Sequence, residues 1–271
     1  MDLNSGYILL NKNLIGSGHH SRVFIGLSPS KTKTAVKLYK NYKVYNREIS
    51  ILKELHNKAN IPTILCTGNI KKVMHYIVMP HYTITLDDFI KSNGKVSAEE
   101  GLYLFYELVL CLEEIHSLDI IHRDIKPMNI MLHNKSMVII DFSLATKRDH
   151  KMTTNVIGSP IFMSINAHRN ELKKYTYQDD LMSCYYTFLY CIEGSLPWSN
   201  IPTLVPKSRL FEEIHFQKSI FKSDYDYLCR NDHADIVLEI ENFFEKEGIS
   251  MSYVKEKFYK KIDVKNSHSI F

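Results

Sequence analysis

The sequence has few cysteines, and they do not occur in the pairs that disulfide frameworks or zinc sites require. There are five, an odd number, and none forms a C-x-x-C pair. Cys111 and Cys184 stand in apolar surroundings, where a cysteine behaves as a small hydrophobic residue. We therefore expect reduced, buried thiols rather than a disulfide framework or a zinc site.

Long hydrophobic runs are also missing. No apolar stretch reaches the roughly 18 residues that a membrane-spanning helix needs, and the N-terminus has no hydrophobic signal segment. We therefore expect a soluble, intracellular protein of the cytoplasm or the nucleus, with no membrane partner.

Charge of either sign is not concentrated. The net charge is only +4, from 34 basic and 30 acidic residues. The basic residues gather in short clusters, at 31–37 and 255–261, rather than in the stripe typical of nucleic-acid binding. These clusters indicate solvated surface, so we expect no direct nucleic-acid partner. The composition leaves open whether the protein forms a homodimer.

What the chain does have is two differently patterned parts. Its 271 residues, 45% of them hydrophobic, suffice for a sizeable core. In the first eighty residues, short runs rich in β-branched and aromatic residues predict strands, with one helix at 42–56. These strands are expected at 7–16, 21–27, 33–39 and 75–80.

The rest of the chain has helical periodicity. The segment 97–116 begins with Ser97 and has Glu100 three residues later, which predicts a capping box. The segment 180–194 is apolar nearly all round and predicts a buried central helix. The pattern changes near residues 80–84, which indicates two lobes with a short connection.

A polar run from His122 to Asn129 lies between hydrophobic pairs, which predicts a loop held at both ends by a core. Asp124 could orient a hydroxyl and accept its proton, and Lys126 could neutralise a transferring phosphoryl group. Asn129 could ligate a metal. Twelve residues later Asp141 follows an apolar strand at 138–140, where a second metal ligand could project.

Two earlier features fit the same chemistry. Gly16 and Gly18 lie between predicted strands, where a turn can place backbone N–H groups over phosphates, although such a turn is often only a hairpin. The strand–loop–strand order disfavours a dinucleotide-binding crossover. Lys37 lies inside an apolar strand and needs an anionic partner, which Glu48 on the next helix could supply.

These motifs, in this order and spacing, resemble the eukaryotic protein kinase superfamily over about residues 7–260. The resemblance implies an α+β, bilobal fold in one catalytic domain with no extra domain. Residues 1–80 would form a small, antiparallel β-rich N-lobe with one main helix. Residues 81–271 would form a larger helical C-lobe with the hinge, catalytic loop, activation segment and substrate platform.

The resemblance implies ATP and Mg²⁺ as cofactors, with Mn²⁺ as an alternative metal. Lys37, fixed by Glu48, would hold the α- and β-phosphates. At the hinge, adenine would bind the carbonyl of Pro80 and the N–H of Tyr82. Pro80 lacks an N–H, but adenine does not use an N–H at that position, so the proline should be tolerated. The nucleotide would lie against Ile15, Gly16, Ser17, Gly18, Val23, Ala35, Met79, Pro80, Tyr82 and Met131.

The same resemblance assigns the catalytic roles. Asn129 and Asp141 would bind the metal. Asp124 would deprotonate the substrate hydroxyl, Lys126 would face the γ-phosphate, and Ser159 would tie these two residues together. A lysine at position 126 is the pattern of serine/threonine kinases.

Other positions concern support and control of this loop. Asp180 matches a buried helix aspartate that braces the catalytic-loop backbone. Arg123 beside Asp124, with Thr153 and Thr154 in the activation segment, would permit control by phosphorylation. The alternative is that both threonines are ordinary loop residues. Ser143 replaces the usual Gly of Asp-Phe-Gly, which narrows the backbone choices there.

Within the superfamily, two segments resemble the casein kinase one group. Ser164-Ile165-Asn166 stands where most kinases have Ala-Pro-Glu, and Gly194 to Trp198 matches a Gly-Ser-Leu-Pro-Trp stretch. The compact chain, rich in Lys, Asn, Ile and Tyr, also resembles virally encoded kinases of the baculovirus type, which would act in the host cell.

We therefore expect an active serine/threonine protein kinase that transfers the γ-phosphoryl group of ATP to a protein hydroxyl. The leading alternative is a pseudokinase, a nucleotide-binding scaffold, whose usual sign is loss of a residue equivalent to Lys37, Asp124 or Asp141. All three are present. A small-molecule phosphotransferase is disfavoured by the length of the segment 141–166, which suits a peptide platform.

Overall fold

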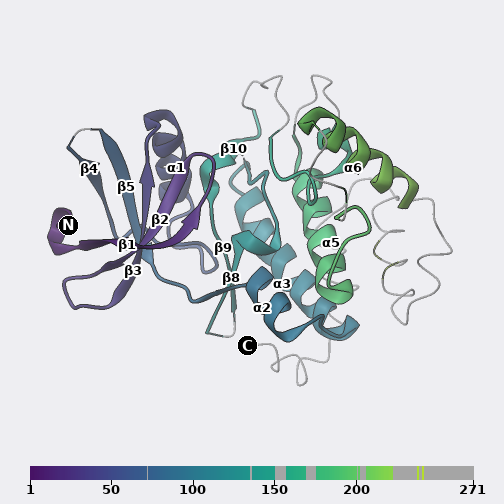
Figure 1. The fold of residues 1–271 in the computed structure, drawn as a ribbon, viewed down its shortest axis with the longest axis horizontal. Helices are drawn as coiled ribbons and strands as arrows, with labels where there is room; N and C mark the ends of the chain where they lie inside the picture. Colours follow the sequence, from purple (N-terminus) through teal and green to yellow (C-terminus); the bar gives the residue numbers. More distant parts are fainter. Residues whose placement is uncertain are drawn as a thin grey trace.

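The structure is a computed structural model in which two parts lie side by side, a β-sheet with one helix and a bundle of helices (Figure 1). This arrangement confirms the expected bilobal α+β fold. The residues that the structure describes are 1–71, 73–134, 136–149, 157–168, 175–199, 201, 206–221, 237 and 240.

The first lobe is built on a five-stranded antiparallel sheet with the strand order β1-β2-β3-β5-β4. Four of its strands coincide with the predicted runs to within about a residue at most ends. The fifth, β4, was not predicted, because its sequence Cys-Thr-Gly-Asn-Ile has little apolar alternation. The strands are β1 (Ile8–Ser17), β2 (Ser21–Leu27), β3 (Lys33–Tyr39), β4 (Cys66–Ile70) and β5 (Met74–Pro80).

Helix α1 (Tyr42–Glu54) packs beside this sheet and carries one buried charge, Glu48, among apolar residues. The side chain of Asn41 caps its N-terminus by accepting a hydrogen bond from the backbone N–H of Lys43 at 2.9 Å. The helix ends two residues earlier than predicted. The chain turns away there, and Asn57 takes a left-handed φ of 71° that a helix does not allow.

The second lobe is mainly helical, and short strands and 3₁₀ turns frame its loops. Its helices are α2 (Leu86–Asn93), α3 (Ala98–His116), α4 (Ile165–His168), α5 (Tyr177–Glu193) and α6 (Lys207–Phe221). Its strand pairs are β6 (Ile84–Thr85) with β8 (Ile130–His133), β8 with β9 (Ser136–Ile139), and β7 (Ile120–Ile121) with β10 (Thr146–Lys147). Among the described residues, the second lobe has the 3₁₀ turns η2 (Pro127–Asn129) and η3 (Phe142–Leu144), and the turn η1 (Asn4–Gly6) precedes the sheet of the first lobe.

Helices α3 and α5 form the centre of this lobe. The capping box predicted for α3 is confirmed, since Ser97 and Glu100 exchange hydrogen bonds. Helix α5 is buried on nearly every side, as predicted, but starts at Tyr177 rather than at residue 180. A second capping box, between Thr176 and Asp179, starts it one turn earlier.

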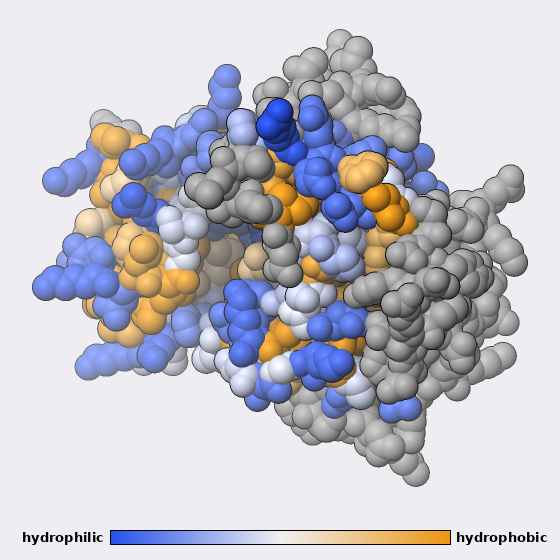
Figure 2. All heavy atoms as spheres, turned by 45° about the vertical axis from the view of Figure 1, so that its right-hand side comes forward, coloured by the Kyte–Doolittle hydropathy of each residue, from blue (hydrophilic) through white to orange (hydrophobic). Residues whose placement is uncertain are grey.

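The surface and the thiols agree with the composition. Figure 2 shows hydrophobic side chains over part of the sheet-containing lobe, where Leu14, Ile15 and Leu65 are exposed. Four cysteines are free and buried, as expected, whereas Cys229 lies outside the described residues. In the part of the chain that the structure describes, no helix is both long and apolar enough to cross a membrane.

The contact between α3 and α5 makes a testable prediction at Gly101. A Cβ at this position would overlap Cγ2 of Ile192 and approach Cε2 of Phe188 to 3.2 Å. Overpacking typically costs about 1–3 kcal/mol, more than the roughly 1 kcal/mol that Ala gains over Gly in a helix. We therefore expect Gly101→Ala to lower the free energy of unfolding by up to about 2 kcal/mol, measured in urea.

The control for this prediction is the same substitution in a variant whose side chain at position 192 has been shortened. In the Ile192→Ala background, Gly101→Ala should cost less than in the wild type. Equal costs in the two backgrounds would show that the helices do not clash at this point.

Candidate active site

The loop from His122 to Asn129 connects β7 to β8 and is held by one buried carboxylate of α5. Asp180, 1% exposed, accepts hydrogen bonds from the backbone N–H groups of His122 and Arg123, each at 2.8 Å. It also lies 3.0 Å from Nε2 of His116. Arg123 takes a left-handed φ of 68°, which this anchoring stabilises. The contact expected of Asp180 from the sequence is therefore present.

The environment of Asp180 keeps it ionised. Burial alone would raise its pKa, but the hydrogen bond and charge of His116 and the charge of His122 outweigh burial and lower it. A charged carboxylate is the acceptor that two parallel backbone N–H groups require.

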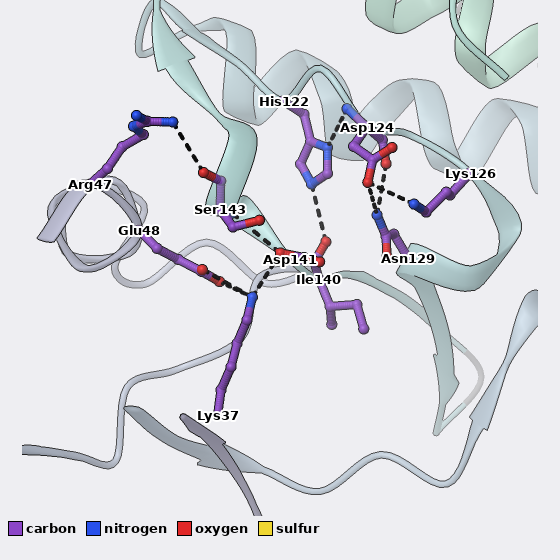
Figure 3. A network of polar contacts seen from close by, with 10 residues as sticks. All are labelled: Lys37, Arg47, Glu48, His122, Asp124, Lys126, Asn129, Ile140, Asp141 and Ser143. Atoms are coloured by element: carbon purple, nitrogen blue, oxygen red, sulfur yellow. Dashed lines mark hydrogen bonds and ion pairs between the residues drawn. The ribbon is translucent and has the colours of Figure 1, made fainter. Parts of the chain in front are cut away.

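Asp124 is the centre of a network within this loop (Figure 3). Nζ of Lys126 lies 2.8 Å from Oδ2 of Asp124 and 2.7 Å from Oγ of Ser159. The Ser159 hydroxyl donates to Oδ1 of Asp124 at 2.8 Å. The amide of Asn129 donates to the Asp124 carbonyl at 2.9 Å and to Oδ2 at 3.0 Å. The structure thus brings together the four polar residues that the sequence predicted here.

Lys37 lies between two carboxylates that come from different parts of the fold. Its Nζ contacts Oε1 and Oε2 of Glu48 at 2.7 and 2.9 Å, and Oδ1 of Asp141 at 2.7 Å (Figure 3). Glu48 comes from α1 and Asp141 from the loop after β9. The anionic partner that an inward Lys37 requires is therefore present, and a second one accompanies it.

Burial and charge act against each other at this triad. Burial alone would lower the pKa of Lys37, but the charges of Asp141 and Glu48 raise it to about 12. Burial would raise the pKa of Asp141, and the charge of Lys37 outweighs it and lowers that pKa well below its ordinary value. The pKa of Glu48 is raised, chiefly by burial. Lys37 and Asp141 are therefore a charged pair at neutral pH.

Asp141 and Asn129 are neighbours through the backbone, because the Ile140 N–H donates to the Asn129 carbonyl at 2.9 Å. Asp141 takes a left-handed φ of 64° and directs Oδ1 to Lys37 and to the N–H of Ser143. Since Lys37 and Ser143 both bind Oδ1, Oδ2 is available, and the Asp141 side chain is 32% exposed.

This donor set fits a hard divalent cation. Mg²⁺ prefers oxygen ligands and is commonly held by one or two carboxylates together with phosphates and water. Asn129 uses its N–H₂ group on Asp124, which leaves its amide oxygen for a metal. Among the described residues no cluster of three or more His, Cys, Asp or Glu could hold a metal alone, so substrate oxygens would have to complete the shell.

Most of the residues predicted to contact adenine and phosphates lie on or next to neighbouring strands of the five-stranded sheet. Val23 pairs with Lys37, and Ala35 pairs with Met79. Residues two apart on a strand share a face, so Ala35 and Lys37 point the same way. Ile15 is 46% exposed, which leaves its side chain free to contact a ligand. Gly16 and Ser17 end β1, and Gly18 lies in the turn after it. Pro80 ends β5, and Tyr82 follows just beyond. Met131 lies on β8.

The turn after β1 is closed by a hydrogen bond from the Gly18 N–H to the Ser21 carbonyl at 2.9 Å. Pro80 pairs with Thr34 at the end of β5, where the missing N–H of a proline is tolerated. The Tyr82 ring lies 5.1 Å from the His133 ring of β8, which links the connection between the lobes to the second lobe.

Arg123 is already engaged in the structure. Its Nε donates to the Leu144 carbonyl at 2.6 Å, and its guanidinium lies 5.5 Å from the Tyr175 ring centre. Burial lowers its pKa to about 10, so it stays charged. Thr153 and Thr154, the expected sites of control, lie outside the described residues.

Sequence reasoning missed one link between α1 and this site. Arg47, next to Glu48, donates from Nη1 to the Ser143 carbonyl at 3.3 Å (Figure 3). A side chain that binds a backbone carbonyl leaves no mark on the sequence of its partner, so only the arginine itself could have been noticed.

Comparison with known protein families gives one match that covers most of the chain. Residues 9–257 match the family described as protein kinase domain. The match includes every residue of the two polar networks above.

The anchoring of the loop by Asp180 makes a testable prediction. Asp180→Asn keeps one oxygen acceptor but turns an N–H₂ group toward a backbone donor. Disrupting a buried, charged hydrogen-bond network typically costs about 3–5 kcal/mol. We expect Asp180→Asn to lower the free energy of unfolding by roughly this amount, measured in urea.

Asp88→Asn provides the matched control, because Asp88 also accepts from a backbone N–H, that of Thr85, but at an exposed helix start. Its cost should stay near about 1 kcal/mol. Similar losses in the two variants would contradict the special role of Asp180.

Proposed function

The chain belongs to the protein kinase family, and from that premise we propose that it is an active serine/threonine protein kinase using ATP and Mg²⁺ or Mn²⁺. The single observation that carries the proposal is the joint presence of two intact charged networks. One holds Lys37 between Glu48 and Asp141, and the other surrounds Asp124. The proposed boundary of the two lobes is residue 80, where β5 ends.

In this proposal the first network binds the nucleotide phosphates. Lys37 is fixed by Glu48 and presents its ammonium group at the base of the sheet face formed by Val23 and Ala35. Asn129 and Asp141 would hold the metal, which when bound neutralises charge on the phosphates. Lys37 would hold the α- and β-phosphates, and the glycines of the turn, Gly16 and Gly18, would let its backbone approach them closely.

The second network handles the acceptor hydroxyl. One carboxylate oxygen of Asp124 accepts a hydrogen bond from Ser159, and the other accepts hydrogen bonds from Lys126 and Asn129. These bonds fix the orientation of Asp124 before substrate binds. It would accept a hydrogen bond from the substrate hydroxyl and take its proton as the hydroxyl oxygen attacks the γ-phosphorus. The bond from that phosphorus to the oxygen bridging to the β-phosphate then breaks, and ADP leaves. Lys126 would stabilise negative charge on the γ-phosphoryl oxygens.

The main alternative is a pseudokinase that only binds nucleotide. The arrangement of Asp124 favours catalysis over this alternative, because nucleotide binding alone does not need a carboxylate oriented by three hydrogen-bonding partners. The residue type at 126 and its bond to Ser159 support a serine/threonine acceptor.

The proposed likeness to the casein kinase one group rests on the sequences of two segments, and each segment has a residue held by a hydrogen bond to the backbone. Ser164 of the Ser-Ile-Asn segment is 2% exposed and accepts from the Ala167 N–H at 3.0 Å. Trp198, the last residue of the Gly-Ser-Leu-Pro-Trp stretch, donates from Nε1 to the Ile161 carbonyl at 2.8 Å. A viral origin, a cytoplasmic or nuclear location and a homodimer stay predictions from sequence.

The first prediction from this proposal concerns Asp124. Asp124→Ala should reduce phosphate transfer from radiolabelled ATP to a protein substrate by about 10²- to 10⁴-fold, the usual contribution of a general base. The dissociation constant for ATP should change little, because Asp124 faces the acceptor rather than the adenine. Asp88→Ala, which removes an exposed carboxylate, serves as the control. Equal transfer by the wild type and Asp124→Ala would refute the enzyme proposal in favour of a scaffold.

The second prediction concerns the acceptor residue. Peptides that differ only in Ser, Thr or Tyr at the acceptor position should be phosphorylated at Ser and Thr. A short hydroxyl-bearing side chain brings its backbone close to the Asp124–Lys126–Ser159 network, whereas a tyrosine ring holds it several ångströms away. Phosphoamino-acid analysis of the products tests this, and mainly phosphotyrosine would contradict it.

A further inference from the structure

Lys218 on α6 is a cation in the interior of the second lobe. It is 1% exposed, and its Nζ lies 2.8 Å from the Pro160 carbonyl oxygen and 2.7 Å from the Met163 carbonyl oxygen. A third contact, at 3.3 Å, is to Nε2 of His168. Within the described part of the chain, none of these polar partners is a carboxylate.

Two aromatic rings complete the surroundings of this ammonium group. Its Nζ lies 4.7 Å from the centre of the Tyr186 ring and 5.3 Å from that of Trp198, within the range of cation–π attraction. Trp198 itself donates to the Ile161 carbonyl at 2.8 Å. Lys218 and Trp198 together therefore bind three carbonyl groups in the four-residue run 160–163.

Burying such a cation is costly, so its position calls for an explanation. Burial holds the pKa of Lys218 well below its ordinary value. Burial and the charge of Lys218 together lower the pKa of His168 to about 3, so the imidazole is neutral and supplies no second charge. An apolar residue would fill this space at a lower cost, but it could not bind the carbonyls of segment 160–163.

The segment that Lys218 binds is continuous with the candidate active site. The Phe162 and Met163 N–H groups donate to the Ser159 carbonyl at 3.0 and 2.9 Å, which folds 159–163 into one compact turn. The Ser159 hydroxyl, at the start of that turn, binds both Asp124 and Lys126. Hydrogen bonds therefore hold this turn on two sides. Ser159 connects it to the network around Asp124, and Lys218 connects it to α6.

We propose that Lys218 is a positioning residue that sets segment 159–163 as the platform for the part of the protein substrate next to the acceptor hydroxyl. This inference rests on the proposed kinase function. The turn begins at a residue that touches Asp124, so a peptide whose hydroxyl reaches Asp124 must pass over it. If the carbonyls of 160–163 lose their partners, the turn loosens and peptide binding weakens, while the proposed nucleotide site around Lys37 is unaffected.

The experiment compares Lys218→Met, which keeps the length of the side chain without its donors, with Ile214→Ala. Ile214 lies one turn earlier on α6 and is 2% exposed, so its truncation weakens the same helix without touching the carbonyls. A milder variant, Trp198→Phe, keeps an aromatic ring and removes only the donor to Ile161. Hydrogen–deuterium exchange of residues 157–168, the KM for a peptide substrate and the dissociation constant for ATP are measured for all of them.

Lys218→Met should speed exchange in 157–168 and raise the peptide KM, each by roughly tenfold, the effect expected from losing one or two hydrogen bonds. Trp198→Phe should shift both in the same direction by less. Ile214→Ala should leave the peptide KM within about twofold, and the dissociation constant for ATP should stay within about twofold throughout.

An unchanged peptide KM in Lys218→Met, or an equal rise in Ile214→Ala, would overturn the positioning role. A parallel loss of ATP affinity in Lys218→Met would overturn it as well, since the damage would then be general. The proposed function fails separately, if the wild type transfers no phosphate to any peptide, whereas the Lys218 inference fails alone when the wild type is active and Lys218→Met matches it.

Discussion

The ammonium group of Lys37 joins two carboxylates that approach it from different lobes, and the contact between the lobes at the candidate active site depends on it. Glu48 fixes the position of α1 against the sheet, and Asp141 fixes the loop after β9 against the same point. Arg47, one residue from Glu48, adds a second link from α1 to that loop through the Ser143 carbonyl. A single buried cation with two anions leaves one net negative charge, which attracts an incoming divalent cation.

The contact between Lys37 and Asp141 also has consequences for the proposed reaction. In the proposed reaction both groups would face phosphate or metal, and in the structure each is an ion-pair partner of the other. Asp141 is the partly exposed member, whereas Glu48 and Lys37 are buried. If a metal or phosphate binds, we therefore expect Asp141 to change its partner, because it is the most exposed of the three residues. The Lys37–Glu48 pair can then stay in place. The left-handed backbone at Asp141 suits this role, because Asp tolerates that conformation better than most residues.

Much of this site could be predicted from the sequence, because its residues act through their side chains in fixed local spacings. Lys37 in an apolar strand, Asp124 five residues before Asn129, and Asp141 after a strand are visible as letters, and the structure brings them together. Strand β4 was missed because its pattern is weak, and α1 was extended too far because a left-handed turn at Asn57 has no strong sequence signal. Lys218 was missed for another reason. It falls on the apolar side of α6 with Ile214 and Phe221, and a lysine there looks like a surface residue until its carbonyl partners, more than fifty positions away, are known.

Two of the buried ionisable residues of the second lobe act by the same physical means. Asp180 on α5 accepts from backbone N–H groups of the catalytic loop, and Lys218 on α6 donates to backbone carbonyls of segment 160–163. In both cases a rigid helix holds a loop through the loop's backbone, so the loop's side chains stay free for chemistry or for substrate. The loops also bury apolar side chains, such as Ile125, Phe162 and Met163, but apolar packing is not directional. Hydrogen bonds from these helix side chains to the loop backbone supply that direction, since charge-assisted hydrogen bonds are short and directional. The catalytic network around Asp124 lies between these two anchors, with Asp180 fixing the backbone before it and Ser159 connecting it to the segment that Lys218 holds.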